Sequence, residues 1–293
     1  MNYSKKGIIL ILLSALCFGS YGVWSKLIGT SFGNFYQGWT RALIIAIILL
    51  PILLFNKQIV PIKNKDYKWL GLFLIFTSLT QAPLFYAFNH MDIGSATLLF
   101  FVSMLLTMYV VGVLFLGEKI TKVKMISFTL AVLGMYVVFS FSLVLFSLLA
   151  ATLAIVNGIA SGGEVSFSKK LSGKYSPLYI SWLSWIIILI TNAPMSIFLG
   201  EVQHFPSFSL IWLYALGYAI TSLFGFWLII KGLKYVEAGI GGLIGLLEIV
   251  FSITLGILIF SEKLSLKIIL GGLLIIIASA LPHIQEIIRK YNH

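Results

Sequence analysis

The sequence predicts an all-α membrane protein with ten transmembrane helices in two inverted five-helix repeats. Three observations support this fold class: the composition, the number of long apolar segments and an internal repeat. Hydrophobic residues make up 60% of the 293 residues and charged residues only 10%, whereas soluble domains hold about half and about a quarter. The net charge of +11 comes largely from lysines in short gaps between apolar runs, a pattern typical of topology signals and not of a nucleic-acid surface.

Ten segments are long and apolar enough to cross a bilayer, since about 30 Å of hydrocarbon requires roughly 20 apolar residues. The first segment lacks a small-residue cleavage site and continues to spanning length, so we expect a retained helix and not a signal peptide. The ten predicted helices are 8–28, 35–55, 69–88, 93–116, 125–141, 144–167, 177–199, 210–230, 238–260 and 266–282.

The distribution of basic residues predicts that both termini are cytoplasmic. With the N-terminus inside, sixteen of the twenty lysines and arginines fall on the cytoplasmic side, as the positive-inside rule requires. Lys263 and Lys267 fall outside, while Lys26 and Arg41 fall within or at the ends of helices. The longest gap, NKQIVPIKNKDYK, is too short to form a separate domain.

An internal repeat divides the chain into two predicted units, 1–142 and 143–293. A shift of 144 positions aligns LGEKIT with FSEKLS, and a shift of 143 aligns Trp39 with Trp182. Because five crossings is an odd number, the second unit must be inverted relative to the first. Inverted repeats with a binding site at their interface are typical of secondary transporters.

The chain resembles the drug/metabolite transporter superfamily, specifically the EamA-type ten-helix transporters, over essentially its whole length. The resemblance rests on FGSYGVWSKL, WTRALIIAIILLP, GEKITKVKMISFTLAVLGMYVV and SEKLSLKIILGGLLIIIASAL. It implies that the two units are EamA-type repeats, and that small metabolites, often amino acids or toxic compounds, are moved outward by facilitated or proton-coupled transport. Ile249 stands where the family commonly has a proline, with Met104 and Leu105 at the corresponding first-repeat positions, so the usual reason for a helix break is missing here.

Glu248 is the strongest candidate for a functional residue. It lies within GLIGLLEIVFSITLGILIF, a segment that otherwise contains no charged residue. A charge at the bilayer centre costs ~2.5–3.5 kcal/mol on insertion scales and is retained mainly for substrate pathways, proton relays or counter-ions. The alternative is a protonated glutamate that forms hydrogen bonds inside the bundle.

The third helix and the first two helices supply further polar candidates. Gln81 and Pro83 lie in the middle of the third helix, where the proline frees the carbonyl of Leu79. Gln81 could donate to this carbonyl or orient a substrate, so a simple kink and a binding role both remain open. Lys26 and Arg41 lie at or near the outer ends of their helices, where they could anchor the chain by reaching water or bind a substrate carboxylate.

Aromatic residues and Glu164 each have two interpretations. Trp24, Tyr86 and Trp227 could line an aromatic cavity, or they could face lipid and pack, as most aromatic residues do in a chain that is 15% aromatic. Glu164 precedes a pair of lysines near the inner end of the sixth helix, which favours an ordinary interfacial salt bridge.

Two acidic residues at helix exits and the C-terminal tail complete the structural expectations. Glu118 and Glu262 are predicted to pair locally with Lys119 and Lys263, the residues that follow them. The tail, IQEIIRKYNH, is predicted to be a short interfacial helix or disordered.

The predicted function is a secondary transporter that moves a small metabolite, an amino acid or similar, across the cytoplasmic membrane by alternating access. Export is the expected direction, a proton is the candidate coupling ion, and the expected surroundings are a lipid bilayer. An enzyme is not expected, because the chain has no HExxH motif and Ser161 has no histidine at the same depth. No metal, cofactor or nucleic acid is expected, and Cys17 is the single cysteine. The alternatives are a channel and a non-transporting membrane sensor or scaffold.

Overall fold

The computed structural model describes residues 5–139 and 147–291, and it describes the side chains only as far as residue 285. The described residues form helices and connecting loops without strands. The helices are α1 (Lys5–Gly19), α2 (Tyr21–Ile28), η1 (Gly29–Ser31), α3 (Asn34–Phe55), η2 (Asn64–Asp66), α4 (Tyr67–Ser78), α5 (Ala82–His90), α6 (Ile93–Leu116), α7 (Lys122–Phe139), α8 (Leu148–Ser172), α9 (Pro177–Phe198), α10 (Leu210–Gly232), α11 (Ala238–Gly245), α12 (Leu247–Phe260) and α13 (Leu266–Tyr291).

Ten helical segments among these residues are long and apolar enough to cross a membrane, which confirms the predicted number of spans. Three of the ten are interrupted: α1 continues into α2, α4 into α5, and α11 into α12. The ninth span is therefore divided at Leu246 although no proline follows Glu248. The proposed boundary between residues 142 and 143, and the predicted helix ends at 141 and 144, lie outside the described residues.

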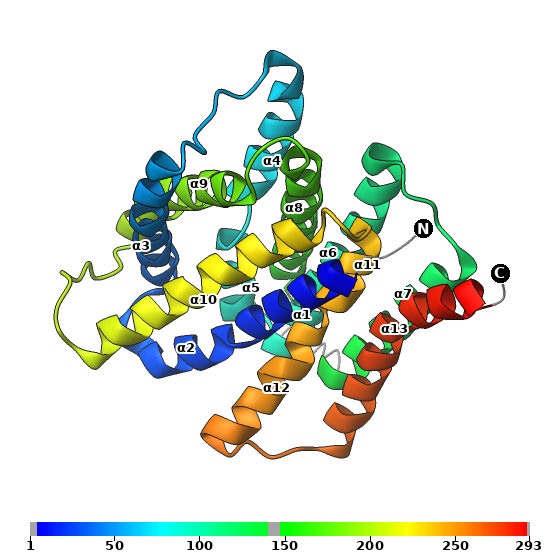
Figure 1. Cartoon of the computed structure of the whole chain (residues 1–293). Coiled ribbons are helices and arrows are strands. Elements are labelled where there is room, and N and C mark those ends of the chain that lie inside the picture. Colours follow the sequence, from blue (N-terminus) through cyan, green and yellow to red (C-terminus); the bar gives the residue numbers. More distant parts are fainter. Residues whose placement is uncertain (1–4, 140–146, 292–293) are drawn as a thin grey trace.

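The helices pack as two related halves around a shared centre (Figure 1). Equivalent helices of the two halves pair directly, since α3 packs against α9 and α7 packs against α13. Helix α8 packs against α6 in the same way that α1 packs against α11 and α12. The fold thus confirms two five-helix repeats related by an approximate twofold.

Glycines set the closest approach between the helices and reveal the residue equivalence of the repeats. A Cβ atom at Gly19 would lie 2.8 Å from Cβ of Phe251, and a Cβ at Gly162 would lie 2.9 Å from Cβ of Thr107. The same two positions face the carbonyl oxygens of Glu248 and Met104, at 2.9 and 2.5 Å. Met104 therefore occupies in the first half the place that Glu248 occupies in the second.

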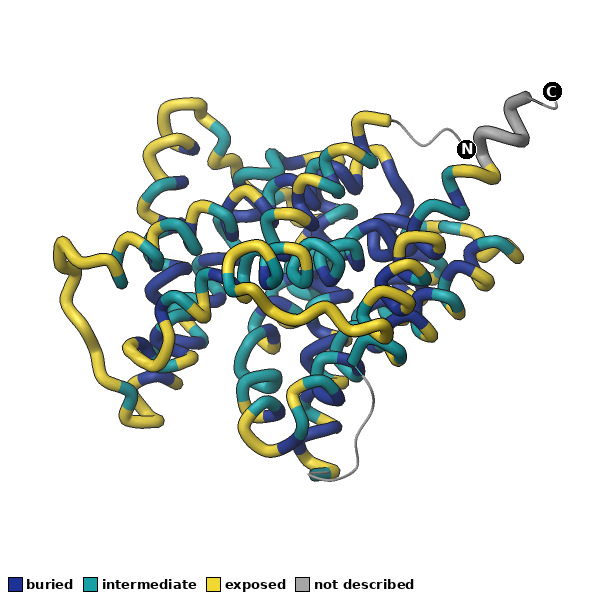
Figure 2. Tube along the Cα trace, turned by 90° about the horizontal axis from the view of Figure 1, so that it is seen from below, coloured by how far each residue is buried: buried dark blue, intermediate teal, exposed yellow. Residues whose placement is uncertain are grey.

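Large apolar side chains cover the outer surface of the helices. Figure 2 shows exposed residues along the outer surfaces of the helices and buried residues concentrated toward the centre. Ile47, Leu114 and Leu258 are examples of side chains that are more than half exposed. A bilayer would cover such a surface, whereas soluble monomers rarely carry apolar patches of this extent.

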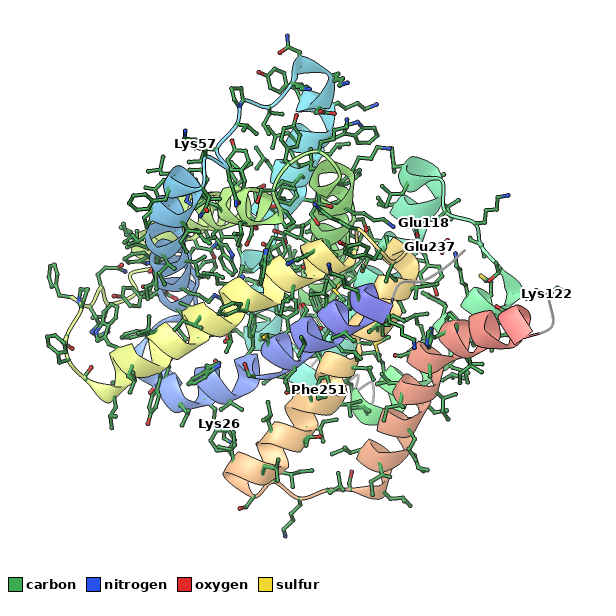
Figure 3. The ribbon with its side chains drawn as sticks, in the orientation of Figure 1. Lys26, Lys57, Glu118, Lys122, Glu237 and Phe251 are labelled. Carbon is green, nitrogen blue, oxygen red and sulfur yellow. The ribbon has the colours of Figure 1, made fainter. Side chains whose placement is uncertain are left out.

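The lysine-rich loops gather at one end of the bundle, which we call the basic end. This end comprises the start of α1 and the loops 56–66, 117–121, 173–176 and 233–237. Lys174 forms an ion pair with Asp66, and the Lys6 ammonium lies 5.4 Å from the ring centroid of Tyr235. Figure 3 shows Glu118 and Glu237 close together at this end and Lys26 far from them at the other.

The C-terminal segment differs from the expected short interfacial helix or disordered tail. Helix α13 continues without interruption to Tyr291, past Pro282, which lies inside it. A proline removes one hydrogen bond and bends a helix, but in this case it does not end the helix.

Candidate functional site

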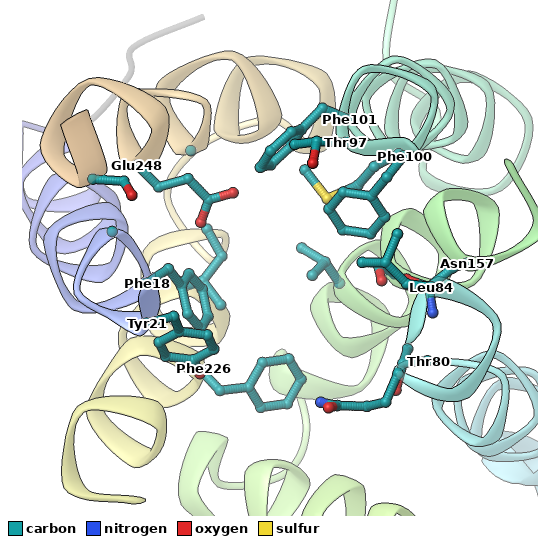
Figure 4. Close-up of a pocket in the computed structure, with 18 of the residues that line it drawn as sticks. Phe18, Tyr21, Thr80, Leu84, Thr97, Phe100, Phe101, Asn157, Phe226 and Glu248 are labelled. Carbon is teal, nitrogen blue, oxygen red and sulfur yellow. The ribbon is translucent and has the colours of Figure 1, made fainter. Parts of the chain in front are cut away.

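A cavity of about 630 Å³ lies at the centre of the bundle between the two repeats. This volume is within the usual range for sites that hold a small molecule. Three charged residues line it, namely Arg41, Glu164 and Glu248. Its amide and hydroxyl groups include those of Thr80, Gln81, Asn157, Ser161 and Ser184, and its aromatic walls include Phe18, Tyr21, Phe100, Phe101, Trp185, Tyr218 and Phe226. Figure 4 shows Glu248 reaching into the open space between these aromatic rings.

Each of the three interrupted spans contributes lining residues beside its break. Tyr21 follows the break between α1 and α2, Gln81 lies between α4 and α5, and Glu248 follows the break at Leu246. Gln81 has a φ of 78°, a left-handed conformation that is uncommon for residues other than glycine. Interrupted helices at mid-membrane are typical of transporter binding sites, because the freed backbone groups face a cavity.

Glu248 lies in the first turn of α12 and is partly buried. No ion pair or hydrogen bond joins its carboxyl group to another of the described residues. Its side chain therefore projects into the cavity without a protein partner, as a residue that meets a substrate or a proton would. The sequence identified this residue through its position in an otherwise apolar segment.

Arg41 and Gln81 come together on another part of the cavity wall. A guanidinium nitrogen of Arg41, Nη2, donates to Oε1 of Gln81 at 3.1 Å. Arg41 lies seven residues inside α3 and is only 4% exposed. The expectation that Arg41 sits at the outer end and reaches water is therefore wrong, because aromatic side chains enclose it.

Glu164 belongs to the cavity and not to an interfacial salt bridge, so that expectation is also wrong. It is buried in α8, where Oε1 accepts hydrogen bonds from the hydroxyls of Ser184 at 2.5 Å and Thr77 at 3.1 Å. The neighbouring Lys169 pairs with Glu118 at the basic end instead. The hydroxyls that identify the Glu164 environment come from α4 and α9, which are distant in sequence.

The carbonyl freed by Pro83 is satisfied by a residue from the other repeat. Nδ2 of Asn157 in α8 donates to the carbonyl oxygen of Leu79 at 3.3 Å. Gln81 was the expected donor, but its amide oxygen accepts from Arg41 instead. Asn157 thereby stabilises the break between α4 and α5.

The remaining predicted site residues do not line the cavity. Lys26 pairs with Glu262 at the end opposite the basic end, with Nζ and Oε1 2.8 Å apart. Trp24 packs on Gly217 of α10. Tyr86 stacks on the ring of His90, with ring centroids 3.9 Å apart, and Trp227 lies under the Lys231 ammonium.

Glu118 closes the basic end of the cavity by joining the two repeats. Its Oε1 atom lies 2.7 Å from Nζ of Lys169 and accepts from the backbone N–H of Ala238 at 2.6 Å. Its Oε2 atom accepts from the N–H of Gly239 at 3.3 Å. A carboxylate at the start of α11 also interacts favourably with the helix dipole. The predicted local pairing of Glu118 with Lys119 is therefore wrong.

Glu262 and Lys26 are the repeat equivalents of Glu118 and Lys169, since 262 − 118 is 144 and 169 − 26 is 143. Their ion pair replaces the predicted pairing of Glu262 with Lys263. The side chains of Lys26 and Glu262 are 54% and 52% exposed, whereas those of Lys169 and Glu118 are 20% and 8% exposed. The two equivalent ion pairs thus lie in different surroundings at the two ends.

The cavity extends toward the end opposite the basic end. Its lining reaches Asn34, the first residue of α3, and Phe139, the last residue of α7. No residue of the basic-end loops lines it. Among the described residues, no group of three His, Cys, Asp or Glu side chains could hold a metal ion.

Ten spans in two inverted halves around a central cavity define a membrane transporter. Two consecutive parts of the chain, residues 5–140 and 148–282, match the EamA-like transporter family. The chain therefore belongs to this family. It is 25% identical over 287 residues to an uncharacterized transporter from Archaeoglobus fulgidus, which covers 94% of each chain. A protein of known crystal structure superposes with a TM-score of 0.76 over 95% of this chain and 96% of its own; at 14% identity, it shows the fold alone.

Proposed function

We propose that this protein is a secondary transporter for a small metabolite, an amino acid or similar, and that it works by alternating access. The observation that carries the proposal is the position of the central cavity between two inverted repeats, with an unpaired carboxyl group, Glu248, projecting into it. In this proposal Glu248 accepts a proton or acts as counter-charge to the substrate, and Gln81 helps to orient the substrate.

The equivalent ion pairs support alternating access. In the described state, Glu118 holds Lys169 and the start of α11 together, and this contact closes the basic end. Exchanging the conformations of the repeats would place Glu262 against the first turn of α6, where Gly94 is equivalent to Ala238. Lys26 would then take the place of Lys169. One carboxylate would close each end in turn.

The proposed setting is the cytoplasmic membrane, with the basic end and both termini in the cytoplasm. The lysines of the basic-end loops support this orientation. In this orientation the described state is open to the outside, and the expected net direction is export. Single cysteines at Lys57 and Lys263 test the orientation, since an impermeant thiol reagent added outside cells should label only the cysteine at Lys263.

The transport proposal is tested by counterflow in proteoliposomes, with a screen of radiolabelled amino acids, nucleobases and cationic dyes. We expect saturable exchange of at least one solute, and we expect Glu248→Gln to abolish its dependence on a pH gradient or its binding. Unsaturated conductance would identify a channel, and the absence of flux for all solutes would favour a sensor or scaffold. Ile47→Val, a change on the lipid-facing surface, is the matched control.

A further inference from the structure

We propose that Arg41 and Trp185 hold a carboxylate of the transported solute, so that the substrate is a small carboxylic acid or zwitterion. The inference rests on the proposed function as a carrier. Arg41 lines the cavity and is 4% exposed. It belongs to none of the ion pairs among the described residues, and its Nε atom is buried without a hydrogen-bond partner.

Aromatic rings and one amide hold the guanidinium in place without neutralising it. Its Cζ atom lies 4.3 Å from the ring centroid of Tyr218, 5.2 Å from that of Tyr21 and 5.4 Å from that of Trp185. The hydrogen bond to Gln81 occupies Nη2. Cation–π contacts and an amide dipole favour the cation, but a buried charge normally also has a counter-charge.

A second unfilled donor lies in the same wall. Nε1 of Trp185 is buried and has no acceptor, and Trp185 also lines the cavity. A carboxylate carries no hydrogen and has two acceptor oxygens, so it can accept from both Arg41 and Trp185. Arginine is well suited to carboxylates, because its planar fork matches their two oxygens.

The carboxylates of the protein do not fill this position. Glu164 accepts from Ser184 and Thr77, and Glu248 lies in α12 without a hydrogen bond to Arg41. The rest of the solute would meet apolar surface, because Trp185 packs edge-on against Phe226 with ring centroids 6.3 Å apart. Figure 4 shows the Phe226 ring across the cavity from Phe101.

The test compares acids with their own amides on purified protein in lipid nanodiscs. The probes are phenylacetate and L-phenylalanine, each against its carboxamide, and the readout is the equilibrium dissociation constant. We expect the better acid to bind at least about tenfold more tightly than its amide, as for the loss of a charge-assisted hydrogen bond. The amide keeps the size and shape of the acid, so the comparison isolates the carboxylate.

Two variants locate the effect. Arg41→Lys keeps the charge but removes the fork, and Trp185→Phe keeps a ring but removes the N–H; each should reduce the preference for the acid. Trp212→Phe makes the same chemical change outside the cavity and should preserve it. Equal binding of acid and amide, or no binding of either acid at millimolar concentration, would overturn the inference. If counterflow is found but the acid has no advantage, the carrier proposal stands and this inference fails. If acids are preferred but no solute is exchanged, the carrier proposal fails.

Discussion

Lys124 and Glu237 form an ion pair buried at the basic end, with side chains that are 7% and 4% exposed. The pair joins α7 of the first repeat to the residue that precedes α11 of the second. The repeat provides no counterpart, since a shift of 144 places Ile268 at Lys124 (124 + 144) and Ile93 at Glu237 (237 − 144). In the proposed exchange, this ion pair therefore stabilises only the state that is closed at the basic end.

Replacing both partners by isoleucine, Lys124→Ile with Glu237→Ile, should shift the protein toward the state that is open at the basic end. The substitution gives the two ends the same residues at these positions. We expect faster hydrogen exchange in the first turn of α11, measured by mass spectrometry in nanodiscs.

The single substitution Glu237→Gln is the control for this pair. It leaves the Lys124 ammonium buried without its counter-charge, which typically costs ~3–5 kcal/mol, whereas replacing both ions by apolar residues is often neutral. We expect the single variant to have a lower Tm than the double variant. Equal Tm values and unchanged exchange would show that the pair does not favour either state.

A methyl group at Gly162 should destabilise the protein by about 1–3 kcal/mol, the usual cost of overpacking a close contact. The added Cβ would lie 2.9 Å from Cβ of Thr107 and would also press on the carbonyl of Met104. Thermal unfolding in detergent measures the effect as a lower Tm. Gly71→Ala is the control, because a Cβ there meets no atom within 4 Å. An equal Tm for the two variants would refute the close packing of α8 on α6.

Asn157→Leu should destabilise the break between α4 and α5. The substitution leaves the Leu79 carbonyl without its donor, at a cost of about 1–3 kcal/mol for an unsatisfied buried group. The expected result is a lower Tm together with faster hydrogen exchange in residues 79–85. Asn56→Leu removes an exposed amide that donates only to its own helix, and it should have little effect on these amides.

Apolar length and charge distribution were sufficient to predict most of the fold. The predicted bounds of the fourth span match α6, and those of the ninth span match the start of α11 and the end of α12. The alignment of LGEKIT with FSEKLS correctly identified the repeat, because each motif follows a helix at an equivalent place. Glu248 was found because a lone carboxyl group in an apolar segment is unusual whatever the tertiary structure.

Partners that come from distant helices could not be predicted in this way. Glu118 and Glu262 each precede a lysine, but a tertiary contact replaces the adjacent partner at both positions. Glu164 resembles an interfacial residue until α4 and α9 place hydroxyls around it. The depth of Arg41 also depends on packing, since its aromatic neighbours lie in other helices.

Alternating exposure of one cavity is tested most directly by a single cysteine at Ser161 in a Cys17→Ala background, labelled by an impermeant thiol reagent from either side of the membrane. Glu118→Gln weakens the closure seen at the basic end, and Glu262→Gln weakens the proposed closure of the opposite end.

We predict that Glu118→Gln increases labelling from the basic side and decreases it from the other side, and that Glu262→Gln has the reverse effect. Labelling that stays the same from both sides in both variants would contradict the account.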